Sequence, residues 1–535
     1  MSFLDKIRSL TRRRQNSIFS ATIVLAVTFG LSAILGFLRS RFLYSHFFKC
    51  CVLDLDAYNA AFRIPDLIFK LLVTGALSAS FIPVFSSYLH KNKQEAYKMA
   101  SSVINLLFIL FIFASIIVLI FVHPLSALVA KGFSPYQIDL MSNLTRILLI
   151  AQIFFLISNF LTAILQVNQF FIVSAFSPVI YNFFIILSIF TLAPAFGIYG
   201  VVYGAVVGAF FHMAIQIPSL RRFGFKYSFV ANFKSTGVKE VIRLMLPRTL
   251  SLGLAEIENT VTLFFSSTLA AGSISLLNLA LQLMYLPSRI FGTTVGQASL
   301  PILSKNIARN QLNTFRQTVR RTILQSLFIA LPISLLILVN RIPIVRLAFG
   351  TKQFPWSATL LTAKTLACLT PAIICQAVIQ ILIRSFYALH DTKTPLRISA
   401  LSLICNVLTS YFFVKFTNFG IVGLAISASI GNLVQCIGLL WLFILRVDGQ
   451  GWPEMLKNFN RILLTSILSA MVSWLSIKCL DLFVLDTTKS INVLLIFGIS
   501  ITSGTISYLF FSHLFHSPEY NHLRSYSGRF LRFLS

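Results

Sequence analysis

Long apolar stretches separated by short basic segments recur along the whole chain, and they limit the fold more than any other feature. Residues 17–38 and 100–123, for example, contain no Asp, Glu, Lys or Arg. Each stretch is long enough to cross the hydrocarbon core of a bilayer as a helix. Charged residues make up only 11% of the chain, against roughly 25% in a soluble domain. The sequence therefore predicts an all-α polytopic membrane protein with no room for a large soluble catalytic domain.

Fourteen transmembrane helices can be placed on these stretches. They are predicted at 17–43, 57–87, 100–123, 138–166, 170–193, 197–219, 241–270, 274–303, 319–341, 356–384, 396–416, 419–446, 459–483 and 490–514. With a cytoplasmic N-terminus, the cytoplasmic segments hold most of the 44 Lys and Arg residues. The positive-inside rule then predicts that both termini are cytoplasmic and that the first stretch is an uncleaved span.

The formal net charge of +29 would suggest nucleic acid if the protein were soluble. Because the charges lie between apolar stretches, we assign them to topology and anionic lipids, and expect no nucleic-acid partner. The seven cysteines show no metal spacing and are expected to be reduced. His513, His516 and His522 lack a carboxylate pair, so neither a metal site nor a cofactor is predicted. The sequence has no motif for ATP hydrolysis or nucleophilic catalysis, which favours a transporter over an enzyme.

The sequence also repeats itself at an interval of about 220 residues. GIYG at 197–200 matches GIVG at 420–423, and Asn182 matches Asn406. An Asn, a Pro, a Gly and a second Pro recur in the same order, as Asn59, Pro65, Gly75 and Pro83 and then as Asn278, Pro287, Gly296 and Pro301. A repeat of six helices predicts two bundles of equal orientation, related by pseudo-two-fold symmetry about an axis along the membrane normal.

The repeat predicts four parts of the chain. They are an N-terminal six-helix bundle at 1–219, a basic cytoplasmic linker at 220–240, a C-terminal six-helix bundle at 241–446, and two further helices with a basic tail at 447–535. Two bundles of this kind are typical of an alternating-access transporter whose substrate path lies between them. The alternative is a large scaffold built by gene duplication.

Charged residues inside the predicted spans are the candidate functional residues, because each costs roughly 2.5–3.5 kcal/mol near the bilayer centre. The candidate cations are Arg39, Arg63, Lys70 and Arg289, with Arg146, Lys364 and Arg384 as further charges, and the candidate acids are Asp56, Asp66, Glu256 and Glu258. Arg63, Asp66 and Lys70 share one helical face, so Asp66 can pair with only one of the two cations.

The surplus positive charge on this face would suit an anionic substrate such as a phosphate. The alternative is a set of interhelical ion pairs that only fixes packing. Asp66, Glu256 and Glu258 are expected to act in gating or in ion pairs. For Glu256 and Glu258 the ion-pair partner would be Arg248, which lies in the same predicted helix.

Several segments resemble the MurJ/MviN family of lipid II flippases, which belongs to the MOP exporter superfamily. They are LSAILGFLRSRFL, LDAYNAAFRIPDLIFKLLVTGALSASFIPVFSSYL, AILQVNQFFIVSAFSPVIYN, LPSRIFGTTVGQASLPILSK and RSFYALHDTKTPLRISALS. The resemblance covers nearly the whole chain. It implies fourteen helices, a cationic central cavity, and transport of an undecaprenyl-diphosphate-linked disaccharide-pentapeptide (lipid II) across the bacterial inner membrane. It also implies that helices 13 and 14 form a groove for the lipid tail.

The family's charged residues carry over only in part. Arg39 occupies the helix-1 arginine of the family, and Asp56 matches the acidic residue that opens helix 2. Ala33, Phe69 and Gln282 stand where the family has cavity arginines, and Tyr285 replaces an acidic neighbour. Lys70, Arg63 and Arg289 lie close to these positions and are expected to restore the cationic character. The departures leave open a changed binding mode or substrate.

The sequence as a whole predicts a monomeric lipid II flippase of the inner membrane that works by alternating access, with cell-wall synthesis proteins as possible partners. The resemblance places the substrate diphosphate on Arg39, Lys70 and Arg289, with Arg63 assisting, while Asp56 orients a cation or relays a gating change. Two alternatives stay open. One is an exporter of another lipid-linked oligosaccharide or of small molecules, like the MATE transporters, and the other is a non-transporting scaffold of the cell-wall assembly machinery.

Overall fold

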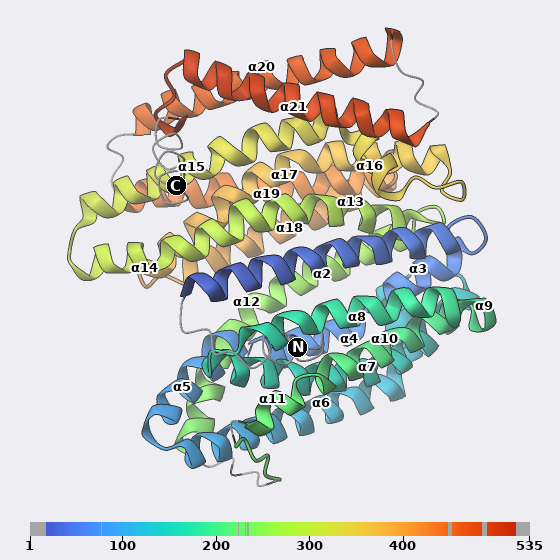
Figure 1. Cartoon of the computed structure of the whole chain (residues 1–535), viewed down its shortest axis with the longest axis vertical. Helices are drawn as coiled ribbons and strands as arrows, with labels where there is room; N and C mark the ends of the chain where they lie inside the picture. The colour runs from blue at the N-terminus through green and yellow to red at the C-terminus, as the bar shows by residue number, and fades with distance from the viewer. Residues whose placement is uncertain are drawn as a thin grey trace, which may run out of the picture. The chain divides into compact units, whose positions relative to one another are not determined.

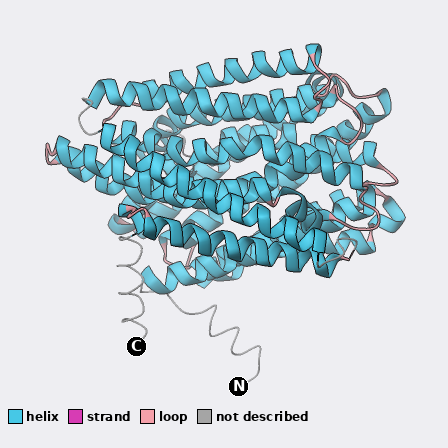
Figure 2. Cartoon of the chain, turned by 90° about the horizontal axis from the view of Figure 1, so that it is seen from above, coloured by secondary structure: helices cyan, strands magenta, loops and turns pink. Residues whose placement is uncertain are grey.

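The computed structural model describes residues 18–75, 77–222, 224–229, 232, 235–447, 452–483 and 489–520. Within these residues the backbone forms helices and no strand (Figure 2). The prediction of an all-α protein is confirmed. The basic C-terminal tail and His522 lie outside the described residues, as does the first part of the chain up to residue 17.

Eleven of the described helical stretches are long and apolar enough to cross a membrane. They are Lys93–Val129, Pro135–Val167, Phe171–Thr191, Ile198–Arg221, Ser273–Ala308, Leu312–Val339, Trp356–Ala388, Lys393–Phe416, Ile421–Val447, Trp452–Asp481 and Ser490–Leu514. Each overlaps one of the predicted spans. The three other predicted spans, at 17–43, 57–87 and 241–270, are helical but are not among the eleven, so the count of fourteen stays a prediction.

The packing of the chain divides it into two compact units, Met1–Ile274 and Ser275–Ser535. The helices of the first unit are α2 (Ile18–Phe47), α3 (Val52–Ala61), α4 (Arg63–Phe69), η1 (Lys70–Thr74), η2 (Leu77–Phe81), α5 (Ile82–Lys91), α6 (Lys93–Val129), α7 (Pro135–Val167), α8 (Phe171–Thr191), α9 (Ala193–Phe196), α10 (Ile198–Ala214), α11 (Ile217–Arg222) and α12 (Thr236–Ser267). The elements labelled η are π-helical, with a wider turn than the α-helix.

The first unit is held together by apolar helix faces. Helix α8 packs between α2 and α10, α7 packs against α6 and α10, and α12 packs against α6, η1 and η2 (Figure 1). Phe81 lies at the centre of its core, stacked on Phe85 with the ring centroids 5.3 Å apart and edge-on to Phe160 at 5.1 Å. Because α12 packs with the first unit, the units divide the chain later than the repeat does, and the predicted domain boundaries stay a prediction.

The second unit contains the remaining helices. They are α13 (Ser273–Ser288), which begins at the division, η3 (Arg289–Thr294), α14 (Val295–Ala308), α15 (Leu312–Val339), α16 (Arg341–Phe349), α17 (Trp356–Ala388), α18 (Lys393–Phe416), α19 (Ile421–Val447), α20 (Trp452–Phe483) and α21 (Ser490–Leu514). Helix α17 is the central one and packs against α14, α15, α16 and α19.

Helices α20 and α21 run side by side, and α20 also packs against α15 (Figure 1). Serine hydroxyls join the pair: the Oγ atoms of Ser473 and Ser500 lie 2.7 Å apart, and Ser469 donates to the carbonyl of Gly504 at 2.7 Å. Small side chains and hydroxyl hydrogen bonds are the usual means of close helix packing in lipid. The groove that the sequence predicts at these two helices stays a prediction.

The sequence repeat has a counterpart in the local backbone. Gly197 and Gly420 both have positive φ angles, of 56° and 54°. Each glycine directly precedes a spanning helix. The N–H group three residues later, that of Gly200 or Gly423, donates a hydrogen bond to the glycine carbonyl at 3.1 Å. Positive φ is readily available only to glycine. The matched GIYG and GIVG segments therefore encode the same tight entry into α10 and α19.

Candidate functional site

The candidate cations Lys70 and Arg289 occupy corresponding places in the two halves of the chain. Lys70 is the first residue of η1, and Arg289 is the first residue of η3. Each π-helical segment follows the proline that recurs in the repeat, Pro65 or Pro287, and is followed by the recurring glycine. Short π-helical turns within α-helices are frequent at functional sites. Each cation therefore begins a π-helical segment between a recurring proline and a recurring glycine, Lys70 five residues after Pro65 and Arg289 two residues after Pro287.

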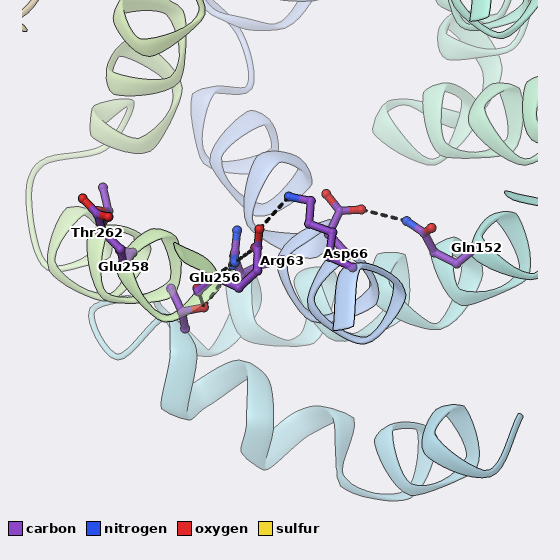
Figure 3. Close-up of polar contacts among 8 residues, drawn as sticks. Arg63, Asp66, Gln152, Glu256, Glu258 and Thr262 are labelled. Atoms are coloured by element: carbon purple, nitrogen blue, oxygen red, sulfur yellow. Dashed lines mark hydrogen bonds and ion pairs between the residues drawn. The ribbon is translucent and has the colours of Figure 1, made fainter. Parts of the chain in front are cut away.

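In the first unit, Arg63 and Lys70 share a single carboxylate, that of Glu256 on α12 (Figure 3). Arg63 forms an ion pair with Glu256 Oε2, and its Nη2 also donates to the Glu256 carbonyl oxygen at 2.8 Å. Lys70 Nζ lies 3.1 Å from Glu256 Oε1. The side chains of Arg63 and Glu256 are only 12% and 8% exposed. Two cations on one nearly buried carboxylate make this the most concentrated charge contact described in the unit.

Thr260, one turn after Glu256, completes the environment of the arginine. Arg63 Nε donates to Thr260 Oγ1 at 3.0 Å, and Thr260 Oγ1 donates to the Glu256 carbonyl at 2.8 Å. The guanidinium group is therefore fixed by three hydrogen-bond acceptors on one face of α12. A guanidinium with several donors in a rigid plane suits such a site better than an ammonium group would.

Asp66 takes a different partner from the one that its place on the helix face suggested. Gln152 Nε2 on α7 donates to Asp66 Oδ1 at 2.7 Å (Figure 3). In the described part of the chain, Arg63 and Lys70 form their ion pairs with Glu256 and not with Asp66. The two cations and the two acids balance, so Glu256 cancels the surplus positive charge that the sequence predicted for this face.

The pairing of Glu256 also bears on the expected role of Arg248. Arg248 was expected to be neutralised by Glu256 and Glu258, but its side chain lies outside the described residues. Glu258 lies on α12 two residues after Glu256, and its carbonyl accepts a hydrogen bond from Thr262 at 2.9 Å (Figure 3). A gating role for either acid stays a prediction.

Asp56 is buried at 3% exposure and contacts a different segment. The backbone N–H of Gly272 donates to Asp56 Oδ2 at 2.6 Å. This bond ties α3 to the turn between α12 and α13, where Gly272 has a φ of 87°. The contact explains why a carboxylate can be buried at this position. Whether Asp56 also orients a cation or relays a gating change stays a prediction.

Arg39 is a candidate cation of the first unit that lies outside the cluster around Glu256. It lies on α2, partly buried and near the phenol groups of Tyr58 and Tyr181. Within the described ranges its guanidinium group makes no hydrogen bond or ion pair. An arginine inside a membrane protein without a carboxylate partner is a natural site for an anionic ligand.

The positions where the sequence departs from the family lie in both units, Ala33 and Phe69 in the first and Gln282 and Tyr285 in the second. Phe69 belongs to the apolar side of the cluster and packs edge-on to Phe155, with centroids 6.4 Å apart. Ala33 is exposed on α2. Gln282 and Tyr285 lie on α13, and Arg289 is exposed at the start of η3. These three belong mainly to the second unit, so their membership of one site with Arg39 and Lys70 stays a prediction.

Sequence reasoning missed one further polar contact, between Ser158 and His212. Ser158 Oγ lies 2.6 Å from His212 Nδ1, and Gln216 Nε2 donates to the same hydroxyl at 2.6 Å. Both partners are buried in the first unit, Ser158 completely so. A hydroxyl that a substrate cannot reach does not act as a nucleophile, and the three side chains instead join α7 to α10. Among the described residues, no three His, Cys, Asp or Glu side chains come together as metal ligands would.

An all-helical fold with eleven candidate spans and a charge cluster within the helices defines a multi-pass membrane protein. The family model described as "Lipid II flippase MurJ" matches residues 51–494. The chain belongs to the lipid II flippase MurJ family.

Individual relatives agree with this assignment. A "Probable lipid II flippase MurJ" from Bdellovibrio bacteriovorus is 26% identical over 504 residues, which cover 92% of this chain and 94% of the relative. A solved structure described as "Lipid II flippase MurJ, inward closed conformation" has 25% sequence identity and a TM-score of 0.76, and the match covers 92% of this chain and 99% of that one. A MATE multidrug transporter in an inward-facing conformation matches with a TM-score of 0.65 at 15% identity. The second structural likeness shows a common fold only.

Proposed function

We propose that the chain moves lipid II across the bacterial inner membrane and that Arg39, Lys70 and Arg289, assisted by Arg63, bind its diphosphate. The observation that carries the proposal is the sharing of the Glu256 carboxylate by Arg63 and Lys70. Two cations that converge on one anionic group form the kind of contact that a phosphate oxygen would make. The family membership supplies the substrate class.

The shared carboxylate suggests how the site behaves between transport cycles. A substrate phosphate would have to replace Glu256 on at least Lys70, whose side chain is 38% exposed and is the more accessible of the two cations. Glu256 then acts as an internal anion that keeps the cations compensated when no substrate is present. Arg63, whose side chain is only 12% exposed, would be strongly destabilising without an anion beside it.

The experiment that tests the function replaces the flippase of a host cell with this chain. The host flippase is depleted, and the fraction of lipid II that reaches an external probe is measured. We expect the wild-type chain to restore access and Arg39→Ala to abolish it at equal protein level, because Arg39 has no carboxylate partner within the described part of the chain. The matched control is Arg146→Ala, since Arg146 is exposed and contacts Asn143 at 2.6 Å.

Two results would contradict the proposal. Normal flipping by the Arg39→Ala protein would remove Arg39 from the binding site. Failure of the well-folded, membrane-inserted wild-type chain would favour another lipid-linked cargo or a scaffold role, provided that the same result is obtained in a host carrying the native partner proteins.

Arg289 offers an independent test of the second half of the chain. It is exposed at the start of η3 and has no ion pair in the described residues. We therefore expect Arg289→Gln to leave the thermal stability of the purified protein unchanged while it reduces flipping at least tenfold, as loss of one charge-assisted phosphate contact does. Undiminished flipping would confine the binding cations to the first unit.

A further inference from the structure

Two cations of the second unit, Lys364 and Arg341, have no acidic partner in the described part of the chain and are not among the proposed substrate-binding residues. Lys364 belongs to α17, eight residues after the helix begins at Trp356, which is about 12 Å along the helix axis. Its side chain is exposed, and it makes no hydrogen bond or ion pair with the described part of the chain. A lysine within a membrane span is costly unless its ammonium group reaches an anion or the membrane interface.

Arg341 lies close to this lysine on the neighbouring short helix. It is the first residue of α16, which packs against α17. Its Nη1 donates to the Leu338 carbonyl at 2.8 Å, at the end of α15. A backbone carbonyl does not neutralise the guanidinium charge, and in the described ranges Arg341 has no acidic partner. Two positive charges therefore face the same region of the unit without a counter-charge.

The two cations line one open pocket with a volume of about 520 Å³. Apolar side chains form most of the remaining wall, among them Leu338 and Val339 of α15, Val422 of α19 and Trp474 of α20. No Asp or Glu belongs to the lining. The pocket is of a size that holds small ligands. Its accessible wall is almost entirely apolar, so Lys364 and Arg341 contribute to it chiefly through the carbon atoms of their side chains. Trp474, which also lines the pocket, is half exposed.

We propose that this pocket binds an anionic phospholipid of the bilayer, with its phosphate on Lys364 and Arg341 and part of an acyl chain along the apolar wall. Three observations support that occupant. The charge is complementary, because two cations without acidic partners suit a phosphate group. The wall is apolar, which suits a chain better than a hydrated small anion. Lys364 lies within a membrane span, where lipid is the abundant source of phosphate. None of the proposed substrate-binding residues lines this pocket.

Native mass spectrometry of the purified full-length protein tests the proposal. The protein is titrated with phosphatidylglycerol and, separately, with phosphatidylcholine of the same acyl chains. We expect the wild type to prefer phosphatidylglycerol. Lys364→Gln and Arg341→Gln should each weaken phosphatidylglycerol binding roughly fivefold, as expected for removal of one cation near a lipid phosphate. Lys364→Arg should retain the preference, because it keeps the charge.

The matched control is Lys352→Gln, which removes an exposed cation between α16 and α17 that does not line the pocket. Trp474→Ala provides a second variant that keeps all charges and should weaken binding of both lipids. Equal binding of the two lipids by the wild type would overturn the proposal, as would unchanged binding by both glutamine variants. Displacement of the phosphatidylglycerol by inorganic phosphate would identify a free-anion site instead. Displacement by an equimolar amount of undecaprenyl phosphate would assign the pocket to the prenyl carrier and overturn the phospholipid assignment.

Discussion

Glu256 is held between two cations that approach from a segment almost two hundred residues earlier in the chain. Its neighbours Arg63 and Lys70 come from α4 and η1, whereas Glu256 itself comes from α12. An ion pair of this kind adds little to stability when it is compared with an apolar replacement, but removal of one partner is costly. A variant of Glu256 should therefore be examined in two measurements, one of the stability of the fold and one of lipid binding.

We predict that Glu256→Gln destabilises the purified protein by about 3–5 kcal/mol, because it leaves two cations around a group that no longer carries charge. The same variant should bind undecaprenyl diphosphate more tightly than the wild type, since the lipid phosphate no longer competes with a carboxylate. Thermal unfolding with and without the lipid measures both quantities. The control is Glu240→Gln, an exposed acid on the same helix. Weaker binding by the Glu256→Gln protein would exclude competition between the carboxylate and the lipid phosphate.

The sequence identified these residues but not their partners. Arg63, Asp66, Lys70 and Glu256 stand out because charge is rare inside spans. Helical spacing, however, relates only residues of one helix, and it suggested that Asp66 pairs with a neighbouring cation. The observed partners come from other helices, and no single-sequence pattern carries that information. Gln152 was missed for a similar reason, because an amide in a long apolar helix has no charge to draw attention to it.

In each of the two units, a glycine with positive φ directly precedes a spanning helix. Gly197 begins the entry into α10 and Gly420 the entry into α19, and a Cβ atom would meet no heavy atom within 4 Å at either position. The constraint at both sites therefore lies in the backbone and not in steric contact with neighbours. This part of the fold was predictable, because GIYG and GIVG are visible as a repeat in the sequence.

We predict that Gly197→Ala and Gly420→Ala each destabilise the protein by about 1–3 kcal/mol, since both force a side chain into a sparsely populated backbone region. The two losses should be similar, because the φ angles are nearly equal. Gly498→Ala in α21 is the control: it also meets no atom within 4 Å, and its φ is not positive. Unfolding in a denaturing detergent series measures the differences. A neutral result for both variants would mean that neither turn limits stability.

The corner between α17 and α18 depends on one carboxylate that lies outside the spans. Asp391 accepts hydrogen bonds from the N–H groups of Lys393 and Thr394, both at 3.0 Å, and from Thr394 Oγ1 at 2.7 Å. It also forms an ion pair with Arg446. Burial alone would raise the pKa of Asp391, but the hydrogen bonds from Thr394 and the charge of Arg446 outweigh it and hold the pKa below its usual value.

This lowered pKa predicts a loss of stability in acid. A carboxylate whose folded pKa lies below its unfolded value stabilises the fold above the unfolded pKa of about 3.9. That contribution is lost as the pH falls through the folded pKa. We expect the melting temperature of Asp391→Asn to fall less steeply than that of the wild type below about pH 4. Asp481→Asn, an exposed acid at the end of α20, should keep the wild-type profile. Parallel profiles for Asp391→Asn and the wild type would contradict the assignment.

At the level of the whole chain, hydropathy predicted most of the architecture. Each of the eleven candidate spans overlaps a span expected from the sequence. The least regular predicted helix, 57–87, proves to be a succession of short α- and π-helical pieces that carries Arg63 and Lys70. Local hydropathy could not reveal those breaks, because they depend on packing against α7 and α12. The segment that carries the proposed binding residues Arg63 and Lys70 is thus the part where simple sequence rules describe the fold least well.

The expected orientation of the chain gives a prediction for the intact cell. If both termini are cytoplasmic, the α14–α15 turn faces the cytoplasm and the α18–α19 turn faces outward. In a variant without its native cysteines, Gln311→Cys should be protected from a membrane-impermeant thiol reagent and Asn418→Cys should be labelled. Both positions are exposed, so lack of reaction reports the side of the membrane. Permeabilised cells, in which both should react, provide the control, and the reverse pattern would invert the topology.

The π-helical segments η1 and η3 have a mechanical consequence. Each is a local fault in the α-helical hydrogen-bond pattern. A fault of this kind can move by one residue along the helix without the helix unwinding. One residue of an α-helix corresponds to about 100° of rotation about its axis. Lys70 and Arg289 stand at the first position of these faults. A shift of the fault by one residue would therefore turn the cation about its helix axis.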